Sequence, residues 1–171
     1  MRRVVLAVHV IAAVGWIGAA CAYLSLTVAA ATSASDDTVR AAFIAMELVY
    51  FALIPLAATA LVSGIAQALG TNWGLLRHYW VVAKLVLTLV AFGVMVNHRG
   101  EVSSHADHVR HAPGADLPGG AATHGVNHAG VGVLILLVAA TLGLYKPRGL
   151  TRYGRRKLRA EREAPSPALE G

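Results

Sequence analysis

The sequence predicts an all-α integral membrane protein, a bundle of four transmembrane helices. Hydrophobic residues make up 56% of the 171-residue chain and charged residues only 14%, whereas a soluble domain has about 45–50% and about 25%. Four long apolar runs can each cross a hydrocarbon core about 30 Å thick, and no sustained period-two alternation indicates strands. The composition excludes a disordered chain. The single cysteine, Cys21, excludes an intramolecular disulfide and a cysteine-based zinc site.

Each apolar run predicts one membrane-spanning helix. We expect these spans at about residues 4–31, 40–69, 78–97 and 126–146. The first run has 28 residues without a charge. We interpret it as a retained helix, because the apolar core of a signal peptide is only about 7–15 residues long. The second run holds one acid, Glu47, and the third holds Lys84. The fourth run is apolar except for Asn127 and His128 at its start.

The basic residues predict both the domain organisation and the topology. Residues 1–147 form the four-helix domain, with a histidine-rich outer loop at 98–125, and residues 148–171 form a basic tail. Of the 15 Lys and Arg residues, 11 lie at the two chain ends or between the second and third spans, and three lie on the opposite side. The positive-inside rule therefore predicts cytoplasmic N and C termini in a plasma-membrane protein.

The tail predicts contact with membrane lipid, because basic juxtamembrane segments are attracted to anionic headgroups. We expect no nucleic acid partner, since the chain carries no supporting motif. The sequence leaves open a homo-oligomer, a redox partner or another membrane-complex partner. A non-catalytic membrane subunit or scaffold is a further hypothesis. Motifs of hydrolases and nucleotide-binding enzymes are absent, so the sequence does not decide whether the protein is an enzyme.

Ionisable residues inside the spans are the first candidates for function, because they are costly to bury in a membrane. At 1.5 Å per helical residue, His9 and Lys84 lie at similar depths in the first and third spans and can be neighbours. One hypothesis is a b-type haem with a redox or electron-transfer role, in which His9 ligates the iron and Lys84 holds a propionate. The other is that both residues are structural, with Lys84 extending its ammonium to the membrane surface and His9 hydrogen-bonded to a neighbouring helix. Glu47 lies about 12 Å from Lys84 along the membrane normal, near the limit of both side chains, so we expect it to be neutral or hydrogen-bonded to a neighbouring helix. A proton-relay role is a further hypothesis.

Six of the eight histidines fall between residues 98 and 128. His98 and His128 end and begin neighbouring spans, so they are candidates to hold a haem from both sides. A second hypothesis is a metal-handling site for Cu or Zn, because clustered imidazoles bind these ions. A third is a polar loop in which the histidines are incidental. The candidate metal ligands are His105, His108, His111, His124 and His128.

Three segments carry a resemblance to known proteins. The first span reads LAVHVIAAVGWIG from Leu6, the third begins WVVAKLVLTL at Trp80, and the tail reads YKPRGLTRYGRR from Tyr145. Together they resemble an actinobacterial family of four-helix integral membrane proteins with a domain of unknown function. The resemblance covers most of residues 1–160 and implies the fold but no activity.

A weaker similarity concerns the oxygen-independent, HemJ-type protoporphyrinogen oxidase and membrane cytochrome b-like proteins. Those proteins share a His followed by a Trp in the first helix, and the oxidase has a W-x-x-x-K-L element in a later one. The matching positions are His9, Trp16, Trp80 and Lys84. The resemblance implies a haem site at His9. It does not carry over the oxidase activity, because the Tyr-His pair expected after the lysine helix is missing from 92–97.

Overall fold

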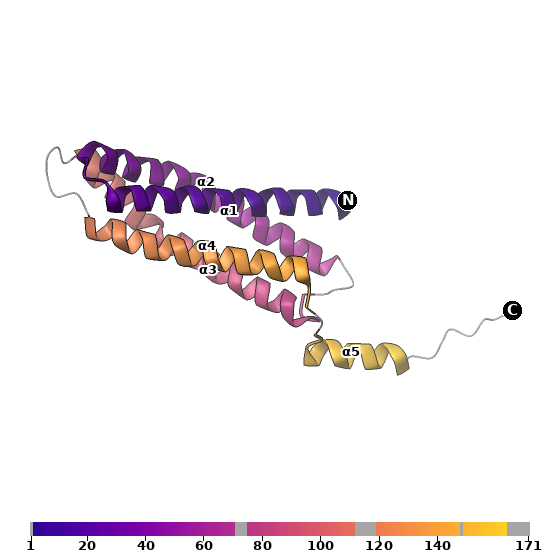
Figure 1. Cartoon of the computed structure of the whole chain (residues 1–171). Coiled ribbons are helices and arrows are strands. Elements are labelled where there is room, and N and C mark those ends of the chain that lie inside the picture. The colour runs from indigo at the N-terminus through magenta and orange to yellow at the C-terminus, as the bar shows by residue number, and fades with distance from the viewer. Residues whose placement is uncertain (1, 71–74, 112–118, 148, 164–171) are drawn as a thin grey trace.

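The computed structural model describes residues 2–70, 75–111, 119–147 and 149–163. Four long helices lie side by side and a short fifth helix follows at one end (Figure 1). They are α1 (Arg2–Thr32), α2 (Asp36–Leu69), α3 (Tyr79–His111), α4 (Gly119–Tyr145) and α5 (Arg152–Glu163). The described residues contain no strand, only an isolated bridge between His78 and Leu150. The predicted all-α class is confirmed.

The four long helices form a closed ring of neighbours. α1 packs against α2 and α4, and α3 packs against the same two helices, so α1 and α3 stand on a diagonal of the bundle. We call the end that carries Leu69, Tyr79 and Tyr145 the tail end, because α5 follows there, and the opposite end the pocket end.

Two clusters of buried side chains make up the interior. The central cluster includes Trp16, Tyr50 and Leu53, and the second, toward the pocket end, includes Phe43 and Met46. Large apolar residues also cover the outside of the long helices, among them Ile11, Phe51, Val131 and Leu144. A soluble monomer rarely exposes so continuous an apolar surface. All four long helices are long and apolar enough to cross a membrane, which is compatible with a multi-pass membrane protein in contact with lipid.

The expected loop at 98–125 is mostly helical instead. α3 continues fourteen residues beyond 97, to His111, and α4 begins at Gly119 rather than near 126. The cause is an apolar stripe that packs against the neighbouring helices: Val102, Ala106 and Val109 are buried, at i, i+4 and i+7 spacing. Hydropathy alone misses this extension, because polar residues occupy its other faces. The basic tail also holds a helix, α5, while residues 164–171 lie outside the described residues.

The extra turns lengthen the bundle toward the pocket end. α2 has 34 residues and α3 has 33, which corresponds to about 50 Å each at 1.5 Å per residue. A bilayer's hydrocarbon core is only about 30 Å thick. His98 lies 19 residues after the start of α3, or about 29 Å along it. A hydrocarbon core that began at the start of α3 would therefore end near His98, so the later turns of α3 extend beyond the length needed to cross it.

Candidate functional site

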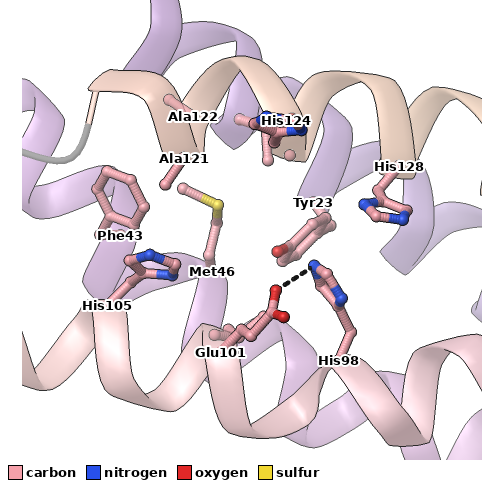
Figure 2. A pocket seen from close by; sticks show the side chains of 13 residues that line it. Tyr23, Phe43, Met46, His98, Glu101, His105, Ala121, Ala122, His124 and His128 are labelled. Atoms are coloured by element: carbon pink, nitrogen blue, oxygen red, sulfur yellow. Dashed lines mark ion pairs between the residues drawn. The ribbon is translucent and has the colours of Figure 1, made fainter.

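A cavity of about 370 Å³ lies at the pocket end, between side chains of all four long helices. Its volume falls within the range of about 300–1,000 Å³ that is usual for small-ligand sites. Figure 2 shows the side chains of α3 on one side and those of α4 on the other. Its ionisable lining consists of Tyr23, His98, Glu101, His105, His124 and His128.

The imidazoles of His98 and His128 meet across the boundary between α3 and α4. Their ring centroids lie 4.5 Å apart with 55° between the ring planes. His98 Nε2 also lies 3.0 Å from a carboxylate oxygen of Glu101, one helical turn along α3 (Figure 2). The His98 side chain is 25% exposed and that of Glu101 is 64% exposed. His98 and Glu101 are thus both reachable from water. Glu101 can fix the orientation of the His98 ring, as carboxylates do for metal-bound histidines.

Apart from Thr27, the rest of the lining is apolar and closely packed. Phe43 and Met46 of α2 are buried, and the Phe43 ring lies 5.9 Å from that of His105. A Cβ on Gly125 would come within 3.1 Å of Thr27 Cγ2. Gly125 therefore lets α4 approach α1 beside the cavity, one turn before His128.

The structure divides the predicted metal ligands into two groups. His105, His124 and His128 line the cavity and are joined by His98, which the sequence had suggested as a haem ligand. His108 and His111 are exposed and do not line it, and His111 Nδ1 bonds to the backbone oxygen of Asp107 at 2.9 Å. Within the described ranges, no three His, Cys, Asp or Glu side chains are already arranged to hold one metal ion. The His98–His128 pair is the nearest approach to a ligand set.

His9 and Lys84 are brought together, as the helical rise predicts. His9 Nε2 lies 3.4 Å from Lys84 Nζ, and His9 Nδ1 lies 2.9 Å from the Ala60 carbonyl oxygen. Because a carbonyl can only accept, Nδ1 carries the proton and donates it, which leaves the Nε2 lone pair facing the Lys84 ammonium. Since α1 and α3 are diagonal, this contact crosses the bundle interior.

Two glycines make room for the pair. A Cβ on Gly64 of α2 would lie 3.0 Å from His9 Cε1, and a Cβ on Gly143 of α4 would lie 3.2 Å from Lys84 Nζ. All four long helices therefore converge on the His9–Lys84 contact. The sequence pattern did not single out either glycine, because a small residue in a membrane helix has no partner until the packing is known.

Neither predicted haem arrangement is preformed at these positions. At His9, Lys84 Nζ lies 3.4 Å from Nε2, so an iron bound to Nε2 requires the Lys84 side chain to turn away. At the pocket end, imidazoles on opposite sides of an iron would have centroids about 6 Å apart, since each metal–nitrogen bond is about 2 Å long. The observed separation is 4.5 Å. When two imidazoles bind one small ion with a bent N–metal–N angle, their ring centroids lie closer together than in the axial arrangement. The observed His98–His128 separation therefore suits a small ion better than a haem iron.

Glu47 does bond to a neighbouring helix, and its partners lie where the sequence predicted a loop. Its carboxylate accepts from Ser103 Oγ at 3.3 Å and forms an ion pair with Arg110, both on the extension of α3. Arg110 also pairs with Asp107 at 3.0 Å. This network ties the extension of α3 to α2 beside the cavity. Sequence reasoning missed it because Arg110 was assigned to the outer loop.

Sequence reasoning also missed nine of the thirteen residues that line the cavity, among them Tyr23, Met46 and Glu101. Tyr23 and Met46 stand inside apolar runs and carry no signal of their own. Glu101 had one, because it follows His98 at i+3 spacing, where side chains of one helix face meet.

No protein-family model matches the chain, and neither does any curated protein or solved structure. Function is therefore argued from the geometry alone.

Proposed function

We propose that the protein is a plasma-membrane protein that binds a transition-metal ion in the cavity at its pocket end. The observation that carries the proposal is the contact between His98 and His128, whose rings lie 4.5 Å apart in a water-reachable cavity. Imidazole is a common ligand of Zn and Cu. Glu101 supports the orientation of His98 from behind.

Completing the ligand set requires side-chain rotation rather than a change of fold. His124 lies one turn before His128 on α4, and both line the cavity. Residues four apart share a helix face, so both imidazoles can reach one ion. Zinc normally takes four ligands, at least three of them from protein. Copper(I) accepts fewer donors and favours soft sulfur, which Met46 offers in the same cavity. The two ions are thus the candidates, with copper favoured by the donors in place.

The basic residues support the orientation. Arg77 precedes α3, and Lys146, Arg152 and the basic residues of α5 follow α4, so they gather at the tail end. Under the positive-inside rule that end is cytoplasmic, with both termini, and the metal cavity faces the outside. In this arrangement the protein captures or carries metal at the outer surface.

Equilibrium metal titration of the protein in mild detergent tests the proposal. Zn²⁺, and Cu⁺ under reductant, are titrated against a competing chelator. We expect the double variant H98Q/H128Q to lose at least about 100-fold in affinity, since even outer-shell partners contribute about 10–100-fold. The matched control H108Q/H111Q removes two histidines outside the cavity and leaves the affinity unchanged. Equal losses in both variants, or no binding by the unmodified chain, would overturn the proposal.

The haem b hypothesis predicts a different observation from the same preparation. A haem ligated by His9, with Lys84 on a propionate, gives a Soret band that sharpens and shifts on reduction and falls in His9→Ala. The metal proposal predicts no such band, because it assigns His98 and His128 to a small ion and leaves His9 in its contact with Lys84.

A further inference from the structure

Hydrogen bonds attach the helix α5 to the tail end of the bundle. We call the bonds that join Arg77 and Tyr79 to Gly149 and Thr151 the junction. Thr151 N donates to the Arg77 carbonyl oxygen at 3.0 Å, and Tyr79 N donates to the Gly149 carbonyl oxygen at 3.3 Å. Thr151 Oγ1 accepts from the Gly154 amide at 3.0 Å, which caps the start of α5. These bonds hold the beginning of the helix beside the connection between α2 and α3.

α5 presents a basic face to solvent. Gly154 is buried against the Arg77 carbonyl, and Leu158, one turn on, is half-buried, so this side of α5 is the one turned toward the α2–α3 connection. Among the side chains of α5 that the structure describes, the basic ones on the remaining faces are exposed. They are Arg152, Arg155, Arg156, Lys157 and Arg159. The two glutamates of the helix come only at its end, after this run.

Three exposed tyrosines lie near the junction, where α3 and α5 begin and α4 ends. Tyr79 begins α3, Tyr145 ends α4 and Tyr153 stands in the first turn of α5. They are 55%, 81% and 58% exposed, respectively. Tyrosines with an apolar ring and a polar hydroxyl collect at the boundary between a membrane and water. The junction therefore places the start of α5 at the level of the lipid headgroups.

We propose that the basic face of α5 binds the phosphate groups of anionic phospholipids in the adjoining leaflet. Each basic side chain close to such a surface contributes about a factor of five to binding. The junction holds the start of the helix that carries the five cations, so less of the binding free energy is lost in ordering the chain. A nucleic acid also has phosphates, but the tyrosine level and the direct continuation from α4 favour lipid. This proposal does not depend on the metal cavity, which lies at the opposite end.

Hydrogen exchange of the full chain in nanodiscs tests the proposal. One set of nanodiscs contains phosphatidylcholine alone and the other contains phosphatidylcholine with phosphatidylglycerol. We expect α5 amides to exchange about 10-fold more slowly with phosphatidylglycerol, a difference that high salt removes. The variant R155Q/R156Q/K157Q loses this difference. The control R2Q/R3Q keeps it, because it removes basic residues at the other end of the chain and leaves α5 intact.

Native mass spectrometry gives an independent reading of the same variants. The unmodified chain retains added phosphatidylglycerol in preference to phosphatidylcholine, and the triple variant does not. Equal exchange in the two kinds of nanodisc, together with no lipid preference by mass, would overturn the proposal. So would slower exchange on adding RNA or DNA to phosphatidylcholine nanodiscs in the absence of any effect of phosphatidylglycerol.

Discussion

Replacing Gly64 by alanine is expected to destabilise the bundle through His9. The new Cβ would lie 3.0 Å from His9 Cε1 and 3.4 Å from His9 Nδ1. Apolar contacts are favourable at about 3.5–4.0 Å, so the ring must move by about 0.5–1 Å. That movement stretches the 2.9 Å bond from Nδ1 to the Ala60 carbonyl oxygen toward the limit of a hydrogen bond.

The magnitude follows from two opposing effects. Overpacking of this kind costs about 1–3 kcal/mol, and the lost hydrogen bond lies within that range. Alanine is intrinsically better than glycine inside a helix by about 0.5–1 kcal/mol. We therefore expect Gly64→Ala to lower the free energy of unfolding by about 1–2 kcal/mol. The assay is unfolding in mixed detergent micelles, followed by circular dichroism.

Gly93 provides a matched control on α3, because no atom lies within 4 Å of a Cβ built there. Gly93→Ala should leave stability unchanged or raise it slightly. In a His9→Ala background, Gly64→Ala should lose its cost, since the ring that it displaces is gone. The reasoning is refuted if Gly64→Ala is as stable as Gly93→Ala, or if its cost persists without the imidazole.

Three further outcomes follow from single contacts. Met46→Leu should weaken Cu⁺ binding by about 10-fold or more and leave Zn²⁺ binding unchanged, because only Cu⁺ favours the thioether. Chelator competition measures both affinities. Equal effects on both ions would contradict a sulfur ligand. Tyr50→Phe removes the 2.6 Å bond from the phenol to the Met95 carbonyl and should cost about 1 kcal/mol in the free energy of unfolding. Tyr23→Phe is the comparison and should cost less, because no hydrogen bond joins its hydroxyl to another helix among the residues that the structure describes. Gly154→Ala places a methyl group against the backbone of the α2–α3 connection and should speed hydrogen exchange throughout α5 without changing exchange in the four long helices; unchanged exchange in α5 would show that the junction is not tight.

The four long apolar helices were predictable because helices able to cross a bilayer need long runs of apolar residues. A run of about 20 mostly apolar residues is the length that a helix needs to cross the hydrocarbon core. The His9–Lys84 contact was also predictable, because helical rise converts sequence position into depth. Depth along a helix does not say which neighbouring helix a side chain faces. Ala60, which accepts from His9, and Gly64, which makes room for it, became visible only once α2 was placed beside α1.

The polar ends of the helices were not predictable from hydropathy. The extension of α3 is stabilised by one buried stripe and by pairs such as Asp107–Arg110, so its average hydropathy falls while the helix continues. The stripe at Val102, Ala106 and Val109 was the signal that identifies it.

The helical extension also determines which histidines share a site. Histidines at three-residue spacing in a loop have no fixed relation. On a helix of 3.6 residues per turn, each such step turns the side chain by about 60° away from alignment. His105 consequently faces the cavity, while His111 has turned away from it. The contact of His98 with His128 required the packing of α3 against α4, which no local pattern reports.

Metal analysis combined with an absorption spectrum of the purified protein tests the central claim most directly. The protein is purified in mild detergent without chelators, and copper, zinc and iron are measured per chain before oxidised and reduced spectra are recorded. The account predicts one bound copper or zinc ion per chain, lost in H98Q/H128Q and retained in H108Q/H111Q, with no Soret band. A Soret band with stoichiometric iron, or a chain that holds neither ion even after both are supplied, would contradict it.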